Sequence, residues 1–231
     1  MSVSSLPSRA HPRTHAPAGP RLNLGCGPVI ADGWINVDGS RRAWLVTRLP
    51  RLDRLLTRLR VLRPTAFTPA VVHHDLRRRL PWPDGSVAAI YAGELWEHLE
   101  YPDARGLMRE CFRILKPDGV LRVCVPDGVA FWARYLAIFD EEWALPEEQR
   151  DAKRLRAHVA QYFADICTRP APLKFAGHFH KWQFDEIQLI DLFRECGFRD
   201  VARMAFHISR IDGIAAIERS DFLIVEGVRG G

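Results

Sequence analysis

The fold is decided by residues 22–38, which read LNLGCGPVIADGWINVD. Residues 22–24 predict a short strand that runs directly into the glycine turn Gly25-Cys26-Gly27, and residues 34–38 predict a second strand that ends at Asp38. Two glycines separated by one residue let the backbone turn sharply and come close to a ligand. The stretch therefore predicts a nucleotide-like ligand held at the ends of two strands.

Strand-like and helix-like stretches alternate along the rest of the chain. Residues 71–75, 87–92, 120–125 and 221–228 are expected to form strands, and residues 51–62, 102–115, 131–143, 147–167 and 185–197 are expected to form helices. The alternation predicts an α/β fold with a mostly parallel twisted sheet and helices on both faces. In such a sheet ligands bind outside the carboxyl ends of the strands, where the motifs of this chain lie.

The length of 231 residues fits one domain over residues 21–231, with a helical insertion or lid at about 128–175. Residues 1–20 are rich in Pro, Ser, His and Arg and are expected to be a disordered leader. The longest apolar stretches fall well short of the roughly 20 residues that span a bilayer, so we expect no transmembrane helix and a cytosolic location. The five cysteines include no C-x-x-C pair, which indicates reduced thiols rather than disulfides or structural zinc.

The basic charge of the chain is concentrated in one segment. The net charge is +5, but residues 41–63 hold eight arginines and one acid, a local charge of +7 that leaves −2 for the rest. Within it, residues 51–62 predict an amphipathic helix with leucines on one face and arginines on another. We expect the leucines to pack on the core and the arginines to be solvated. A role at a membrane surface or toward an anionic substrate is the alternative.

In combination, these motifs resemble the class I S-adenosylmethionine-dependent methyltransferases, in particular a small family whose first motif looks like residues 22–38. The likeness covers residues 22–127 and returns at His180-Lys181-Trp182, whereas residues 128–175 have no counterpart. Its further motifs are Asp75-Leu76, Glu97-His98-Leu99, the stretch ECFRILKPDG at 110–119, and Val125-Pro126-Asp127.

The resemblance implies a Rossmann-like class I methyltransferase fold and S-adenosyl-L-methionine as cofactor. It implies that the glycine turn lies against the methionine end, that Asp38 holds the ribose and that Glu94 lines the pocket, while Asp75 and Leu76 flank the adenine; the cofactor set is thus Gly25, Cys26, Gly27, Asp38, Asp75, Leu76 and Glu94. Two residues depart from the common class I pattern, Asn23 in place of an acid and Val29 in place of a third glycine. The dinucleotide fingerprint also lacks its third glycine, because Ile30 stands there, which argues against NAD.

Methyl transfer requires mainly that acceptor and methyl group be held in line, so no elaborate catalytic triad is expected. If the acceptor is a hydroxyl, His98, His178 or His180 is the candidate base, since imidazole titrates near neutrality. His178 and His180 form an H-x-H pair without an obvious third ligand, so no metal site is expected.

The resemblance points to a small-molecule or sugar-containing acceptor, methylated at oxygen or nitrogen. The arginine-rich helix and the insertion at 128–175 are expected to form the acceptor side, and the charge of the arginine-rich helix suggests an anionic acceptor. The alternatives are a nucleic-acid methyltransferase and a non-catalytic cofactor-binding protein of the same fold. The first is disfavoured because residues 93–96 read GELW, where base-amino enzymes usually carry an Asn-Pro-Pro-Tyr-like motif.

Overall fold

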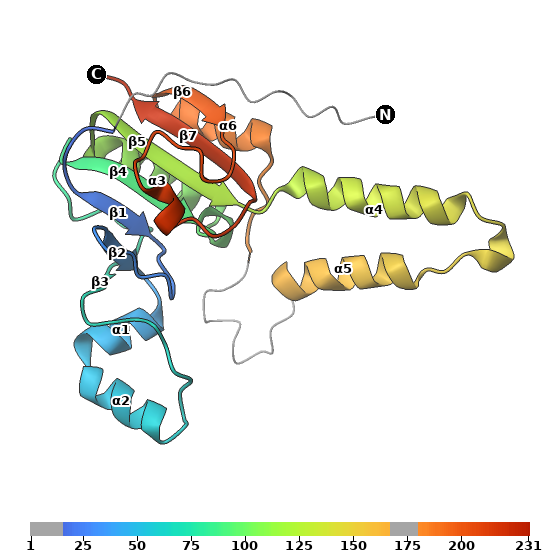
Figure 1. Ribbon diagram of the computed structural model, residues 1–231, viewed down its shortest axis with the longest axis horizontal. Coiled ribbons are helices and arrows are strands. Elements are labelled where there is room, and N and C mark those ends of the chain that lie inside the picture. The colour runs from blue at the N-terminus through green and yellow to red at the C-terminus, as the bar shows by residue number, and fades with distance from the viewer. Residues whose placement is uncertain (1–15, 167–179) are drawn as a thin grey trace.

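A computed structural model describes residues 16–166 and 180–231 and shows one seven-stranded sheet (Figure 1). The strand order is β3-β2-β1-β4-β5-β7-β6. β7 is antiparallel to both of its neighbours, and the other pairs are parallel. The strands are β1 (Arg21–Leu24), β2 (Ile35–Asp38), β3 (Val72–His73), β4 (Val87–Gly93), β5 (Leu115–Val125), β6 (Phe198–Arg203) and β7 (Leu223–Arg229). The expected α/β fold with a mostly parallel sheet is confirmed.

The two faces of the sheet are covered differently. On one face the main core joins Ile90 and Leu121 to the buried sides of α3 (Tyr101–Ile114) and α6 (Glu186–Glu195). On the other face Tyr91 and Cys124 pack against isoleucines of the segment 204–217, which contains the short helix η4 (Ile214–Ala216). Period-two alternation along β4 and β5 therefore supplies apolar side chains to both faces.

Two buried asparagines hold the connection from β1 to β2. The Nδ2 group of Asn23 donates to the Val29 carbonyl at 3.0 Å and to Oδ1 of Asn36 at 2.9 Å. Asn36 also accepts from the backbone N–H of Ala31 at 3.0 Å and donates to the Trp34 carbonyl at 3.2 Å. A buried amide that satisfies its partners in this way fixes a loop firmly. Asn23 thus takes a structural role at the position where many class I enzymes carry an acid.

The basic segment forms two helices, α1 (Arg41–Arg48) and α2 (Pro50–Arg58). The expectation that the leucines of residues 51–62 pack on the core is wrong: Leu52, Leu55 and Leu59 are 41%, 51% and 62% exposed. Asp53 is buried instead and pairs with Arg42 of α1 at 3.0 Å. The two helices hold each other through polar contacts, and the apolar stripe of α2 faces away from the sheet.

The chain leaves the sheet after β5 as a helical arm, which Figure 1 shows extending away from the body. α4 (Gly128–Trp143) begins at Asp127, whose side chain accepts from the N–H groups of the first turn. The short helix η2 (Glu147–Gln149) precedes α5 (Lys153–Ile166), which runs beside α4. The rings of Phe131 and His158 stack between the two helices at 4.2 Å. The described part of the expected insertion is helical, and its end lies outside the described residues.

Several local expectations need correction. β6 was not expected, and the helix expected at 147–167 begins only at Lys153. The turn expected at residues 116–119 is a bulge inside β5, where the register with β4 shifts. The other pattern-based elements are confirmed, with Asp185 as the side-chain cap of α6. Across residues 16–166 and 180–231, every helix is too short or too polar to cross a bilayer.

Candidate functional site

The glycine turn after β1 adopts a backbone that requires glycine. Gly25 and Gly27 have φ values of +64° and +50°, in the left-handed region that L side chains rarely adopt. A Cβ added at position 25 would also lie 2.9 Å from Cδ1 of Leu95, in the segment after β4. The turn is therefore packed tightly against the β4 end of the site, and both its conformation and its contact exclude a larger residue.

Asp38, at the end of β2, holds this turn in place. Its Oδ2 accepts from the N–H of Gly27 at 3.0 Å, and its Oδ1 accepts from the N–H of Ser40 at 2.8 Å. Ser40 in turn caps α1. The carboxylate is 7% exposed, and each oxygen keeps capacity for one more donor. Sequence reasoning placed Asp38 at a strand end correctly but missed that it braces the glycine turn from inside the fold.

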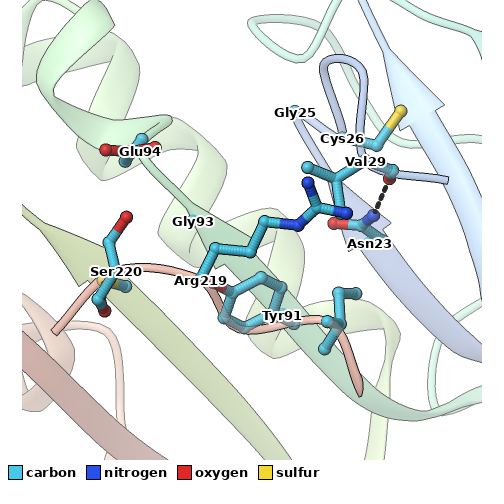
Figure 2. A pocket seen from close by; sticks show the side chains of 11 residues that line it. Asn23, Gly25, Cys26, Val29, Tyr91, Gly93, Glu94, Arg219 and Ser220 are labelled. Carbon is cyan, nitrogen blue, oxygen red and sulfur yellow. Dashed lines mark hydrogen bonds between the residues drawn. The ribbon is translucent and has the colours of Figure 1, made fainter. Parts of the chain in front are cut away.

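A pocket opens between the glycine turn and the end of β4 (Figure 2). The Arg219 side chain extends across it toward Asn23 and Val29. Glu94 directly follows β4 with a φ of +54°, an uncommon backbone for a non-glycine residue that often marks functional positions. The lining consists of Asn23, Gly25, Cys26, Val29, Tyr91, Gly93, Glu94, Cys124, Ile217, Arg219 and Ser220.

Asp75 and Leu76 lie farther along the same sheet edge and do not line this pocket. Asp75 comes shortly after β3 in the chain. Its Cα is 3.6 Å from where a Cβ of Gly39 would stand, so Asp75 lies close in space to the end of β2. Its carboxylate forms a two-point ion pair with Arg77, at 2.9 Å for both oxygens, which lowers its pKa. Leu76 is buried in the main core. Their contact with an adenine stays a prediction.

Cys26 is unsuited to be a nucleophile. Burial, together with the charge of Asp38, raises the pKa of its thiol to about 12, so it stays protonated at neutral pH. Its side chain packs with Ala43 and Val71. Among the described residues, four cysteines are buried and free: Cys26, Cys111, Cys124 and Cys196.

Arg219 and Ser220 are pocket residues that sequence reasoning missed. They precede β7, and because β7 is antiparallel, its first residues lie at the same edge as the last residues of β5. Arg122, which is fully buried on β5, anchors this segment to the sheet. It pairs with Glu218, the residue before Arg219, at 2.7 Å and with Glu226 of β7 at 2.8 Å. The antiparallel last strand is the feature that would have pointed to them.

Two of the three candidate histidines lie together, next to the short helix that follows β4. His98 ends the short helix η1 (Trp96–His98), and its ring centroid is 5.0 Å from that of His180. Glu97 lies beside them, 2% exposed, and burial raises the pKa of its carboxyl to about 8. His180 of the H-x-H pair thus lies close to two residues that follow β4, Glu97 and His98. His178 lies outside the described residues.

The strand order, the glycine turn after β1 and the acid at the end of β2 define the class I methyltransferase fold. Residues 22–123 match the family model of the methyltransferase domain. This part of the chain is therefore similar to the methyltransferase domain, and the sheet has the strand order of the class I methyltransferase fold.

Known relatives resemble the chain in part. A protein of Mycolicibacterium smegmatis named as a probable S-adenosylmethionine-dependent methyltransferase is 29% identical over 120 residues, 48% of this chain and 39% of its own length. The chain thus spans well under half of that relative. A Thermotoga maritima structure, named as a possible histamine N-methyltransferase, is 16% identical with a TM-score of 0.45, covering 92% of this chain and 83% of its own. A methyltransferase structure from Archaeoglobus fulgidus is 12% identical with a TM-score of 0.47, covering 92% and 87%.

Proposed function

We propose that this chain transfers the methyl group of S-adenosylmethionine to oxygen or nitrogen of a small-molecule or sugar-containing acceptor. The observation that carries the proposal is the glycine turn braced by Asp38 over the end of β1, beside a pocket that reaches the end of β4. The cofactor supplies the electrophilic methyl carbon, and the protein supplies position and a site sheltered from water.

Within this proposal, Gly25, Cys26 and Gly27 hold the methionine end of the cofactor, and Asp38 accepts from the ribose hydroxyls with its remaining lone pairs. Glu94 lines the pocket where the reacting end would lie. Asp75 and Leu76 flank the adenine, for which Asp75 must share its carboxylate with Arg77.

The Arg219 guanidinium is available to bind an anionic group of a ligand inside the pocket. It extends across the cavity, and no hydrogen bond involving its side chain is present in the described part of the chain. Both the methionine carboxylate and an anionic acceptor offer the paired oxygens that a guanidinium binds best.

The acceptor side is proposed to include the basic helices α1 and α2. Arg51, Arg54 and Arg58 are all exposed on α2, so they are available to an anionic acceptor such as a phosphorylated or nucleotide-linked one. For a hydroxyl acceptor, the proton is taken up at the cluster formed by Glu97, His98 and His180, which lies beside the end of β4.

The test is methyl transfer from labelled S-adenosylmethionine to an acceptor panel of sugars, nucleotide-linked sugars, phenols, amines, and RNA and DNA oligomers. Gly25→Val, which both the backbone and Leu95 oppose, serves as the inactive control. Label in a small or sugar-containing acceptor, lost in Gly25→Val, supports the proposal. Label in the oligomers alone would make the chain a nucleic-acid methyltransferase, and cofactor binding without any transfer would make it a non-catalytic binding protein.

A further inference from the structure

Three side chains with metal-binding atoms converge at the short helix η1, which follows β4. Glu97, His98 and His180 each offer one ligand atom, and these three atoms all lie within 4.8 Å of one another. Two of the residues come from the short helix η1 after β4, and the third comes from the segment that leads to α6. The grouping joins parts of the chain that lie far apart in sequence.

The backbone fixes this arrangement. The N–H of Lys181 donates to the Glu97 carbonyl at 2.6 Å, and the N–H of Trp182 donates to the same carbonyl at 3.2 Å. The Trp182 ring also packs on Tyr101 at the start of α3, with centroids 5.0 Å apart. His180 is therefore held against η1 by its immediate neighbours in the chain.

The Glu97 carboxyl is the unusual member of the cluster. It is 2% exposed, and among residues 16–166 and 180–231 neither oxygen has a hydrogen-bond partner. A buried carboxyl without a partner costs free energy, and native proteins retain such a group where it binds a ligand, a cation or a proton. Glu94 also acts electrostatically on it, and the negative charge of Glu94 favours a nearby cation.

We infer that Glu97, His98 and His180 bind a divalent transition-metal cation of the zinc class. Two imidazoles and one carboxylate form the ligand set of catalytic zinc sites and of other open transition-metal sites. Magnesium and calcium prefer oxygen ligands alone, so the two imidazoles disfavour them. Three protein ligands leave a coordination position open for a further oxygen or nitrogen.

The geometry lies close to what such an ion needs. Ligand atoms about 2.1 Å from a tetrahedral ion are separated by about 3.4 Å. Because the three atoms lie within 4.8 Å of one another, each pair would have to approach by at most about 1.4 Å, a distance that changes of side-chain rotamer can provide. The ion would also give the buried carboxylate of Glu97 the partner that the described fold does not provide.

The inference deepens the proposed function but does not depend on it for its test. If the chain methylates a hydroxyl, an oxygen bound at the open position would lose its proton more readily, because a bound cation lowers the pKa of its oxygen ligand. His98 and His180 would then act as metal ligands in place of general bases. Metal binding itself requires neither S-adenosylmethionine nor an acceptor.

The experiment is a calorimetric titration of the chelator-treated full chain with Zn²⁺, with Mg²⁺ in a second titration, and visible absorption with Co²⁺ as a probe of coordination. Glu97→Gln and His180→Gln test the ligands. Glu100→Gln, an exposed acid in the same segment, and His207→Gln, a histidine of the 204–217 segment, are the matched controls. Circular dichroism verifies folding of each variant.

We expect one Zn²⁺ per chain with micromolar or tighter affinity, a four-coordinate Co²⁺ spectrum, and much weaker Mg²⁺ binding. Each ligand variant should lose at least a hundredfold in Zn²⁺ affinity, and each control should stay within about threefold. Absence of Zn²⁺ binding by the folded chain, or equal affinity in the ligand and control variants, would overturn the inference. If Glu97→Gln does not fold, His180→Gln and the Co²⁺ spectrum decide it, and a failure here leaves the methyl-transfer assay unaffected.

Discussion

The end of β2 and the segment after β4 each bury an acidic side chain near the same edge of the sheet. The two side chains differ in their hydrogen-bond partners. Asp38 receives two backbone N–H groups, from Gly27 and Ser40. Glu97 is more deeply buried, and neither of its oxygens has a hydrogen-bond partner in the part of the chain that the structure describes. The carboxylate of Asp38 is built into the hydrogen bonds of the fold, whereas under the proposal above the carboxyl of Glu97 gains its partner from a bound cation. A satisfied buried charge should therefore stabilise the chain, and an unsatisfied one should not.

The largest effect is expected at Arg122, the fully buried charge whose partners are all present. Arg122→Met leaves Glu218 buried without its cation and Glu226 with only Arg210 at 3.7 Å, and should lower the free energy of unfolding by about 3–5 kcal/mol. Denaturant unfolding measures the change. Arg199→Met, which removes an exposed ion pair with Asp118, is the control and should change stability by less than about 1 kcal/mol. Equal losses in the two variants would contradict the distinction between satisfied buried charges and surface ones.

Asp38→Ala should weaken cofactor binding by roughly tenfold to several hundredfold, because charge-assisted hydrogen bonds contribute about 1.5–3 kcal/mol each. It should also lower the free energy of unfolding by about 1–3 kcal/mol, since the N–H groups of Gly27 and Ser40 lose their acceptor. Asp38→Asn should fall between, and Asp32→Ala, an exposed acid in the same connection, should change neither quantity. Calorimetry and melting temperature together decide it; unchanged cofactor affinity in a folded Asp38→Ala variant would remove Asp38 from the site.

The exposed arginines of helix α2 can be replaced to remove charge with little expected effect on the fold. Replacing Arg51, Arg54 and Arg58 together by Gln should raise the KM for an anionic acceptor by roughly tenfold at low salt, and less at high salt, where exposed charges are screened. Cofactor affinity and melting temperature should stay unchanged, because Asp53 is the buried residue of this helix. Arg194→Gln with Arg199→Gln, two exposed arginines near β6, is the control. A loss of folding in the triple variant would show that the helix is structural.

The smallest effect is expected at Glu97, measured without metal. In a chelator-treated chain, Glu97→Gln removes no hydrogen bond and eliminates a buried ionisable group, so the free energy of unfolding should stay the same or rise by about 1 kcal/mol. Asp38→Asn, measured in parallel, should be less stable than the natural chain. A clear destabilisation by Glu97→Gln would mean that the carboxyl has a structural partner, and the contrast between the two acids would fail.

Sequence patterns predict the parts of this molecule that depend on neighbouring residues. The glycine turn, the strand ending at Asp38 and the cap of α6 are local, and each is found where the pattern places it. The leucines of α2 show the limit of periodicity: a stripe at helical spacing predicts a helix but not the element that covers it. Three of those leucines are at least 41% exposed.

The less predictable residues reach the site through the topology of the sheet. Arg219 and Ser220 line the pocket because β7 runs antiparallel to β5. His180 lies next to Glu97 and His98 because the N–H groups of Lys181 and Trp182 donate to the Glu97 carbonyl. Neither contact has a local sequence signal. The Asn23–Asn36 pair is intermediate, since both residues were visible in the motif but their mutual hydrogen bond depends on the register of β1 and β2.

The most direct test of the account is a side-by-side calorimetric titration of the full chain with S-adenosylmethionine, S-adenosylhomocysteine and NAD. The braced glycine turn and Asp38 predict binding of both methionine cofactors in the micromolar range, about 7–9 kcal/mol, with much weaker binding of NAD. The same binding should be lost in Gly25→Val. Heat with NAD and none with either methionine cofactor would contradict the placement of the cofactor over β1 and β2 and, with it, the proposed methyl transfer.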